Sequence, residues 1–236
     1  MGLYRWVFFD LFDTLCTVDE DIYYAGKREA AKAANLDYND FMRAWRDTSP
    51  HASTGVLKTP YARAEKALAL LGVWDRRTAA EISRLDVDTI QQCVRFYDGA
   101  QDALGTLRER GFSLGLISNA TATTAFAIGP LNLRLRIDQL VFSYEVGAAK
   151  PEPRIYEAAL GRAGCKAADA LFVGDGANRE LDAARAAGFG TVCMDHPSKA
   201  HTFRNPESLS APDHRVVHGF SELLGLPSLA GPADDD

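Results

Sequence analysis

The sequence lacks the features that mark membrane proteins and nucleic-acid-binding proteins. No apolar run in its 236 residues approaches the roughly 20 residues that a helix needs to span a bilayer. The chain carries 26 Lys and Arg against 32 Asp and Glu, a formal charge of −6, and it has no block of basic residues. We therefore expect neither a membrane nor a nucleic acid among its partners.

Cysteine and histidine are too scattered to predict a metal site or a redox pair. Cys16, Cys93, Cys165 and Cys193 include no Cys-x-x-Cys pair, and the five histidines show no ligand spacing such as His-x-x-x-His. We expect no zinc site, and we expect the cysteines to be reduced core residues. No signal-peptide pattern or myristoylation motif precedes Trp6. Together these absences favour a cytoplasmic protein.

A glycine-rich nucleotide loop is also missing. Gly174 and Gly176 have the spacing of such a loop, but the third glycine is absent and no Gly-Lys-Ser/Thr follows. Neither dinucleotide nor P-loop binding is therefore predicted. The length suits one large domain, or a core domain with an insertion.

The most informative stretch that is present begins at Trp6. Trp6 to Phe9 form a short apolar run rich in β-formers, and the run ends at Asp10. This pattern predicts a buried strand with Asp10 at its carboxyl end, where open α/β sheets bind ligands. A carboxylate there can act as a nucleophile or a metal ligand, or can simply begin a turn. Thr14 can donate a hydroxyl to the same pocket.

The rest of the chain divides into a helical part and a part where helices and strands alternate. Residues 18–97 contain no convincing strand and carry apolar residues at helical spacing, with a loop at 48–59. Beyond Asp98, helices separate strands predicted at residues 112–117, 140–142, 170–173, 191–194 and 216–217, with a less regular stretch between the first two. This alternation predicts a parallel, doubly wound α/β sheet with the helical part inserted into it.

Several chemically active side chains fall at the predicted strand ends. Asp10, Ser118-Asn119 and Asp175 end strands, and Lys150 lies in a loop before a helix. In a parallel sheet these ends meet at one rim. Asp10 and Asp175 can supply oxygen ligands to Mg²⁺, while Lys150 and Ser118 can neutralise a phosphoryl group.

Four segments in this order and spacing resemble the motifs of the haloacid dehalogenase (HAD) superfamily, in the branch with a helical cap inserted after the first strand. The matching segments are Asp10-Leu-Phe-Asp-Thr-Leu15, Ser118-Asn119, Lys150-Pro-Glu-Pro-Arg-Ile-Tyr156 and Gly174-Asp-Gly-Ala-Asn-Arg-Glu180. The resemblance implies a Rossmann-like core from residues 1–14 and 98–236 and a helical cap from residues 15–97. Within the core, the residues at the end of the chain predict a disordered tail at 228–236.

The resemblance also implies a role for each matching residue. Asp10 would be the nucleophile that forms an aspartyl-phosphate with a small phosphorylated substrate. Ser118 and Asn119 would hold phosphate or substrate, and Lys150 would pair with both the nucleophile and the phosphate. Mg²⁺ would be held by the Asp10 side chain, the backbone carbonyl of Phe12, Asp175 and, directly or through water, Glu180.

Phe12 departs from the phosphatases of that superfamily, which usually carry a second Asp there as general acid and base. A phenyl ring cannot move a proton, and such catalysis is typically worth about 10²–10⁴-fold. One hypothesis is that Asp13 substitutes, although its side chain is expected to point elsewhere. Another is a slow phosphatase in which water or a substrate group carries the proton. The third is a catalytically impaired, ligand-binding relative.

The rival reaction is 2-haloacid dehalogenation of a small halogenated substrate. Dehalogenases of the superfamily often carry an aromatic residue at the position of Phe12, need no metal, and bind halide or carboxylate through an Arg of the cap. Arg43 and Arg46 are available for that role. Asp175 with Glu180, however, resembles the metal-binding form of the last motif. We therefore favour a Mg²⁺-dependent phosphatase over a metal-independent dehalogenase.

Overall fold

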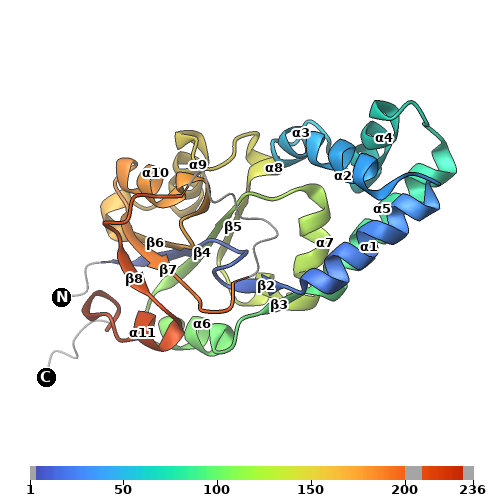
Figure 1. The fold of residues 1–236 in the computed structure, drawn as a ribbon. Coiled ribbons are helices and arrows are strands. Elements are labelled where there is room, and N and C mark those ends of the chain that lie inside the picture. The colour runs from blue at the N-terminus through green and yellow to red at the C-terminus, as the bar shows by residue number, and fades with distance from the viewer. Residues whose placement is uncertain (1–3, 200–208, 231–236) are drawn as a thin grey trace, which may run out of the picture.

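The computed structural model describes residues 4–199 and 209–230, and it is built around one six-stranded sheet. The strands lie in the order β5-β4-β1-β6-β7-β8, and every neighbouring pair is parallel. This confirms the predicted parallel α/β sheet (Figure 1). The strands are β1 (Trp6–Phe9), β4 (Ser113–Ser118), β5 (Gln139–Phe142), β6 (Ala170–Gly174), β7 (Gly190–Met194) and β8 (Arg215–Val217).

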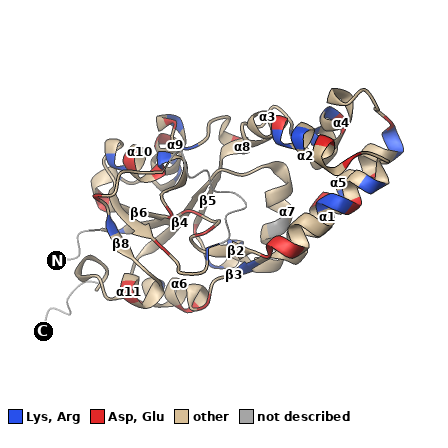
Figure 2. Cartoon of the chain, in the orientation of Figure 1, with Lys and Arg blue, Asp and Glu red and all other residues tan. Residues whose placement is uncertain are grey.

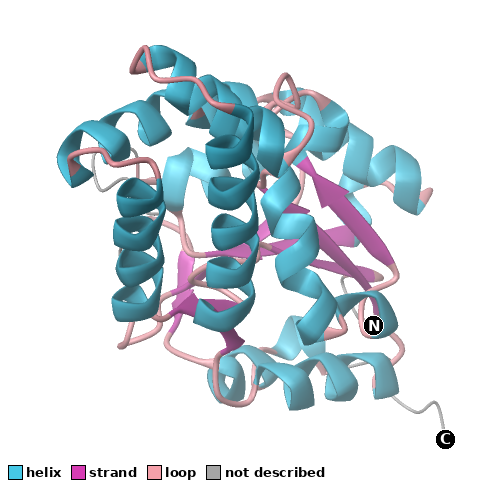
Figure 3. Cartoon of the chain, turned by 90° about the vertical axis from the view of Figure 1, so that its right-hand side faces the viewer, coloured by secondary structure: helices cyan, strands magenta, loops and turns pink. Residues whose placement is uncertain are grey.

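Strand β1 lies inside the sheet and is buried on both faces. Val7 and Phe9 belong to one core and Phe8 to another, because successive side chains of a strand point to opposite faces. A strand covered on both faces needs the unbroken apolar run seen in the sequence. The covering helices are α6 (Ala100–Glu109) and α11 (Phe220–Leu224) on the first face, and α9 (Pro153–Ala163) and α10 (Glu180–Ala186) on the second (Figure 1). Figure 3 shows the strands of the sheet with helices around them.

Charged residues are almost absent from the sheet (Figure 2). Arg215 in β8 is the one Lys, Arg, Asp or Glu within its six strands. The charges of any site at the sheet edge must therefore come from the loops that follow the strands.

Residues 20–93 form a helical unit beside the sheet (Figure 1). Three of its helices begin directly after Asp19, Thr59 and Asp75. Each of these side chains accepts a hydrogen bond from the backbone N–H of the residue three positions later. The unit has its own core, in which Trp45 and Ile82 are buried. Within the described residues, no helix is both long and apolar enough to cross a membrane. The helices are α1 (Glu20–Ala33), α2 (Tyr38–Asp47), α3 (Ser49–Ser53), α4 (Pro60–Leu70) and α5 (Arg76–Cys93).

The expectation that residues 18–97 contain no strand is wrong. β2 (Cys16–Val18) pairs antiparallel with β3 (Val94–Phe96) where the chain enters and leaves the helical unit. Strands of three residues that pair across the whole insertion are too short to show a period in the sequence. We keep the division into a core and a cap of residues 15–97 as a proposal, with this two-stranded sheet at its boundary.

Three other expectations also need correction. Residues 48–59 contain the short helix α3. The stretch after β4 contains α7 (Ala122–Leu131), whose Pro130 and lack of an amphipathic pattern concealed it, and α8 (Ser143–Val146) follows β5. The tail expected to be disordered from residue 228 includes a 3₁₀ turn, Pro227–Leu229, with Leu229 fully buried. Residues 231–236 lie outside the described residues.

Gly115 allows β4 to pass beside the ring of Phe8, because an added Cβ would lie 2.2 Å from the Phe8 ring carbon Cδ1. We expect Gly115→Ala to lower the free energy of unfolding by about 1–3 kcal/mol through overpacking, as measured by urea denaturation. Gly105→Ala is the matched control. Gly105 is exposed in α6 with nothing within 4 Å of an added Cβ, so that change should raise stability by about 0.5–1 kcal/mol. Equal stability of the two variants would contradict this packing.

Candidate functional site

The side chains predicted at the strand ends converge on one edge of the sheet. Asp10 directly follows β1, Asp175 follows β6, and Lys150 lies in the loop before α9. They line a cavity of about 50 Å³ together with Phe12, Asp13, Asn119, Ala177, Asn178 and Glu180. Seven of the residues proposed from the sequence thus share one cavity.

Asp10, Asp175 and Glu180 form a buried carboxylate cluster. One oxygen from each lies within 4.8 Å of the others, and the three residues are 7%, 3% and 2% exposed. The N–H of Gly176 donates to Glu180 Oε1 at 3.1 Å. A Cβ added to Gly174 would lie 2.1 Å from the same oxygen. The glycine at the end of β6 therefore leaves the space that Glu180 occupies.

Lys150 is the cation that balances this cluster. Its buried ammonium forms ion pairs with Asp10 Oδ1 and Glu180 Oε2. The Asn119 side chain fixes the Lys150 backbone: the Lys150 N–H donates to Asn119 Oδ1 at 2.7 Å, and Asn119 Nδ2 donates to the Lys150 carbonyl at 2.9 Å. This positioning role of Asn119 was not predicted from the sequence.

The cluster holds more negative charge than Lys150 can neutralise. Burial raises the pKa of Asp10, Lys150 opposes that rise, and Asp175 adds to it. Burial likewise raises the pKa of Glu180, to about 8, against the effect of Lys150. Burial lowers the pKa of Lys150 itself, but the two carboxylates outweigh burial and raise it. Carboxylate oxygens this close together, with one ammonium among them, fit a hard divalent cation such as Mg²⁺.

Asp13 lies in the same cavity, contrary to the expectation that its side chain points elsewhere. Its backbone is left-handed, with φ 56°, a conformation that Asp adopts more readily than most residues. The Tyr97 hydroxyl donates to Asp13 Oδ1 at 3.2 Å. Burial, and next the charge of Asp175, raise the pKa of Asp13 to about 7. The sequence does not single out Tyr97, because its spacing from Ile90 and Cys93 predicts one more apolar residue of a helix.

Thr14 and Ser118 do not line the small cavity. Both are fully or almost fully buried, and neither hydroxyl has a hydrogen-bond partner among the described residues. The carbonyl of Thr14 accepts a hydrogen bond from His196 Nε2 at 2.9 Å. The structure therefore places these two residues beside the site and gives no contact that assigns them to substrate.

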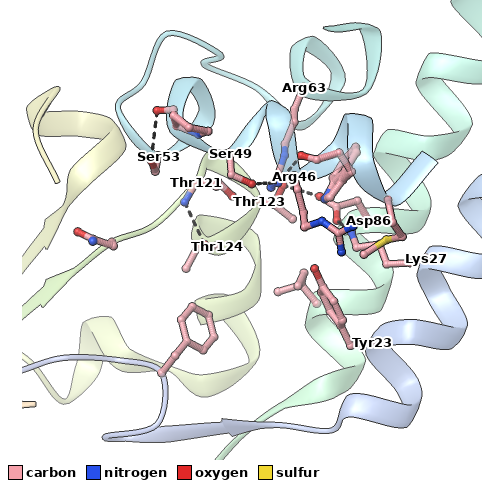
Figure 4. A pocket seen from close by; sticks show the side chains of 16 residues that line it. Tyr23, Lys27, Arg46, Ser49, Ser53, Arg63, Asp86, Thr121, Thr123 and Thr124 are labelled. Atoms are coloured by element: carbon pink, nitrogen blue, oxygen red, sulfur yellow. Dashed lines mark hydrogen bonds and ion pairs between the residues drawn. The ribbon is translucent and has the colours of Figure 1, made fainter. Parts of the chain in front are cut away.

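A second cavity, of about 410 Å³, adjoins the first between the helical unit and α7 (Figure 4). Phe12 and Asn119 line both cavities. The sequence offers Arg43 and Arg46 of the helical unit for substrate binding, and of these two Arg46 lines the cavity. The others come from separate helices, so no single motif contains them. They are Tyr23, Lys27, Met42, Trp45, Ser49, Pro50, Ser53, Arg63, Asp86 and Ile90, and they face Thr121, Thr123 and Thr124.

Comparisons with known proteins place the chain in a family. A family model described as haloacid dehalogenase-like hydrolase matches residues 4–188. The chain is 36% identical over 157 residues to the haloacid dehalogenase-like hydrolase domain-containing protein 3 of Homo sapiens, with 66% of this chain and 61% of the human protein covered. Its matches to three curated phosphatases span only about half of their lengths.

Two other similarities extend over nearly the whole chain. Pyrimidine 5'-nucleotidase YjjG of Escherichia coli (strain K12) is 28% identical over 235 residues, which cover 93% of this chain and 97% of that protein. The structure of L-2-haloacid dehalogenase from Xanthobacter autotrophicus matches with a TM-score of 0.62 at 18% identity, covering 93% of this chain and 96% of that one. At that identity the structural match shows a common fold alone.

The ion pairs of Lys150 predict a large stability effect. We expect Lys150→Met, measured in urea without divalent metal, to lower the free energy of unfolding by about 3–5 kcal/mol, because it leaves buried carboxylates uncompensated. Lys58→Met is the control: Lys58 is exposed and makes no hydrogen bond or ion pair with any described residue, so its loss should change stability by less than about 0.5 kcal/mol. Similar midpoints for the two variants would show that Lys150 does not balance the cluster.

Proposed function

The chain belongs to the haloacid dehalogenase-like hydrolases, and we propose that it hydrolyses phosphomonoesters of small metabolites, with Asp10 as nucleophile and Mg²⁺ as cofactor. The observation that carries this proposal is the buried cluster of Asp10, Asp175 and Glu180 around Lys150. Phosphoryl transfer depends chiefly on positioning and charge neutralisation. Such a concentration of acidic groups is what a cation-assisted phosphatase requires, whereas departure of a halide needs no metal.

The first step of the proposed reaction forms an aspartyl-phosphate. A carboxylate oxygen of Asp10 attacks phosphorus, and the bond from phosphorus to the leaving alcohol oxygen breaks. Lys150 neutralises charge on the phosphoryl oxygens and holds the attacking carboxylate. Bound Mg²⁺, held by Asp10, the Phe12 carbonyl, Asp175 and Glu180, would supply further positive charge at the phosphoryl group.

The leaving alcohol must take up a proton, and water must later lose one when it hydrolyses the aspartyl-phosphate to phosphate and free Asp10. Phe12 cannot take part in either transfer. We propose that Asp13 does, because it lines the same cavity as Asp10 and is positioned by the hydroxyl of Tyr97. Asp13 then gives a proton in the first step and regains one in the second.

Dehalogenation of 2-haloacids is the second candidate, and the observation in its favour is Phe12, which lies in the cavity beside Asp10. In that reaction Asp10 would displace halide from carbon, and no leaving-group proton would be needed. We prefer the phosphatase hypothesis because the dehalogenase reaction gives Asp175 and Glu180 no role.

A product assay on the purified protein separates these functions. We expect phosphate release from a panel of phosphomonoesters that requires Mg²⁺, disappears with chelator, and falls by at least about 10²-fold in Asp10→Asn. Halide release from 2-haloacids should be absent with the metal chelated. Metal-independent halide release would overturn the phosphatase proposal. Release of neither phosphate nor halide would favour a catalytically impaired relative.

The proton role of Asp13 predicts a dependence on the leaving group. We expect Asp13→Asn to lower kcat/KM for glycerol 3-phosphate by about 10²–10⁴-fold. The loss should be much smaller for p-nitrophenyl phosphate, because p-nitrophenolate leaves without a proton, and slow hydrolysis of the aspartyl-phosphate should then produce a burst of p-nitrophenolate. Asp98→Asn, which changes an exposed residue next to Tyr97, is the control. Equal losses for both substrates without a burst would argue against this role.

A further inference from the structure

The 410 Å³ cavity carries positive charge that the proposed reaction at Asp10 does not use. Lys27, Arg46 and Arg63 line it, against the single carboxylate of Asp86. Because Phe12 and Asn119 line both cavities, a phosphoryl group beside Asp10 would direct the rest of its molecule into this space. Cavities of roughly 300–1,000 Å³ commonly hold small-molecule ligands.

The carboxylate of Asp86 is already satisfied by its neighbours. Its Oδ1 forms an ion pair with Lys27, and its Oδ2 accepts a hydrogen bond from the Thr123 hydroxyl at 2.7 Å. The Lys27 ammonium also lies 4.3 Å from the centre of the Trp45 ring. Lys27 and Asp86 therefore neutralise one another, and two arginines remain.

Arg63 is held in the cavity wall by protein groups. Its Nε donates to Thr48 Oγ1 and its Nη2 to Ser49 Oγ, both at 3.0 Å. Its guanidinium carbon lies 4.3 Å from the centre of the Trp45 ring. Arg63 thus adds a fixed positive charge to the wall.

Arg46 lines the same cavity and is exposed to solvent, and its guanidinium forms no hydrogen bond or ion pair with any residue that the structure describes. Figure 4 shows it among Lys27, Asp86 and Arg63. Arg43, one helical turn earlier, is instead ion-paired with Asp40 on the surface. Arg46 is therefore the guanidinium on this wall that can give a planar set of donors to a ligand anion.

We propose that this cavity selects phosphomonoesters with a second anionic group, a carboxylate or another phosphate, and that Arg46 pairs with that group. The proposal rests on the phosphatase function proposed above. The fixed positive charge of Arg63 attracts the same anion from the wall. Because Asp86 is paired with Lys27, its carboxylate does not compete with the ligand anion for Arg46. A neutral distal group would leave Arg46 without a partner.

Binding of phosphonates tests this pocket without turnover, since their C–P bond resists phosphatase hydrolysis. The probes are 3-phosphonopropionate, 1,3-propanediphosphonate and propylphosphonate, which has the same three-carbon chain but no distal anion. They are titrated calorimetrically with Mg²⁺ present. We expect the wild-type protein to bind one or both doubly anionic probes about 10- to 150-fold more tightly than propylphosphonate, the range for a hydrogen bond between charged groups. Which of the two binds better identifies the distal group as carboxylate or phosphate.

Three variants assign the preference to one side chain. Arg46→Gln should abolish it while leaving the affinity for propylphosphonate unchanged, and Arg46→Lys should restore part of it. Arg43→Gln, the control on the same helix, should retain all of it. The proposal would be overturned if the wild-type protein bound all three phosphonates equally, or if Arg46→Gln weakened the binding of all three by the same factor. It would also be overturned if uridine 5'-phosphate bound more tightly than the doubly anionic probes and its affinity did not depend on Arg46.

Phosphate release from 3-phosphoglycerate and glycerol 3-phosphate, which differ in the distal carboxylate, completes the test. We expect the first to be the better substrate and to lose this advantage in Arg46→Gln. Arg46-dependent phosphonate binding without phosphate release from any ester would overturn the phosphatase function. It would still support a cavity in which Arg46 binds a second anionic group. Phosphate release without the binding preference would do the opposite.

Discussion

The concentration of buried negative charge at the ends of β1 and β6 is the constraint on which the rest of the site depends. Like charges repel strongly where water is excluded, so Asp10, Asp175 and Glu180 can stay together only with compensation. Lys150 compensates two of them directly. The side chain of Asn119 fixes the Lys150 backbone from the end of β4. The groups that balance this charge thus come from separate strands and loops. They meet only after the sheet has formed.

The pair Phe12 and Asp13 links backbone conformation to chemistry. Phe12 places a ring where the resemblance to the superfamily leads one to expect an acid. The left-handed backbone of Asp13 turns the Asp13 carboxyl group into the same cavity. Tyr97, which follows the short strand β3, then fixes that carboxyl group. In the proposed mechanism the two-stranded sheet of β2 and β3 therefore does more than join two parts of the chain, because it brings Tyr97 to the nucleophile loop.

The two adjoining cavities divide the proposed function between the two parts of the chain. The loops after the strands supply the groups for phosphoryl transfer, and these lie within a small cavity lined mainly by charged residues. The helical unit supplies Arg46 and Arg63, which lie where the distal part of a substrate would reach. Phe12 and Asn119 border both spaces, so changes in the helical unit can alter the substrate without altering the reacting groups.

The sequence by itself determined the fold class and which residues meet at the sheet edge, because apolar runs fix the strands and parallel strands end at one edge. Asp10 and Asp175 were placed at this edge in this way, with Lys150 in a loop before a helix, whereas Glu180 was implied by the resemblance to the HAD superfamily. The partners of these residues were decided by tertiary structure: Asn119 with the Lys150 backbone, Tyr97 with Asp13, and Arg46 with its cavity. Such contacts join side chains far apart in the chain, and they depend on backbone turns and helix packing that leave no local period. A local pattern can place a residue on a strand or helix, but only the packed chain determines what that residue touches.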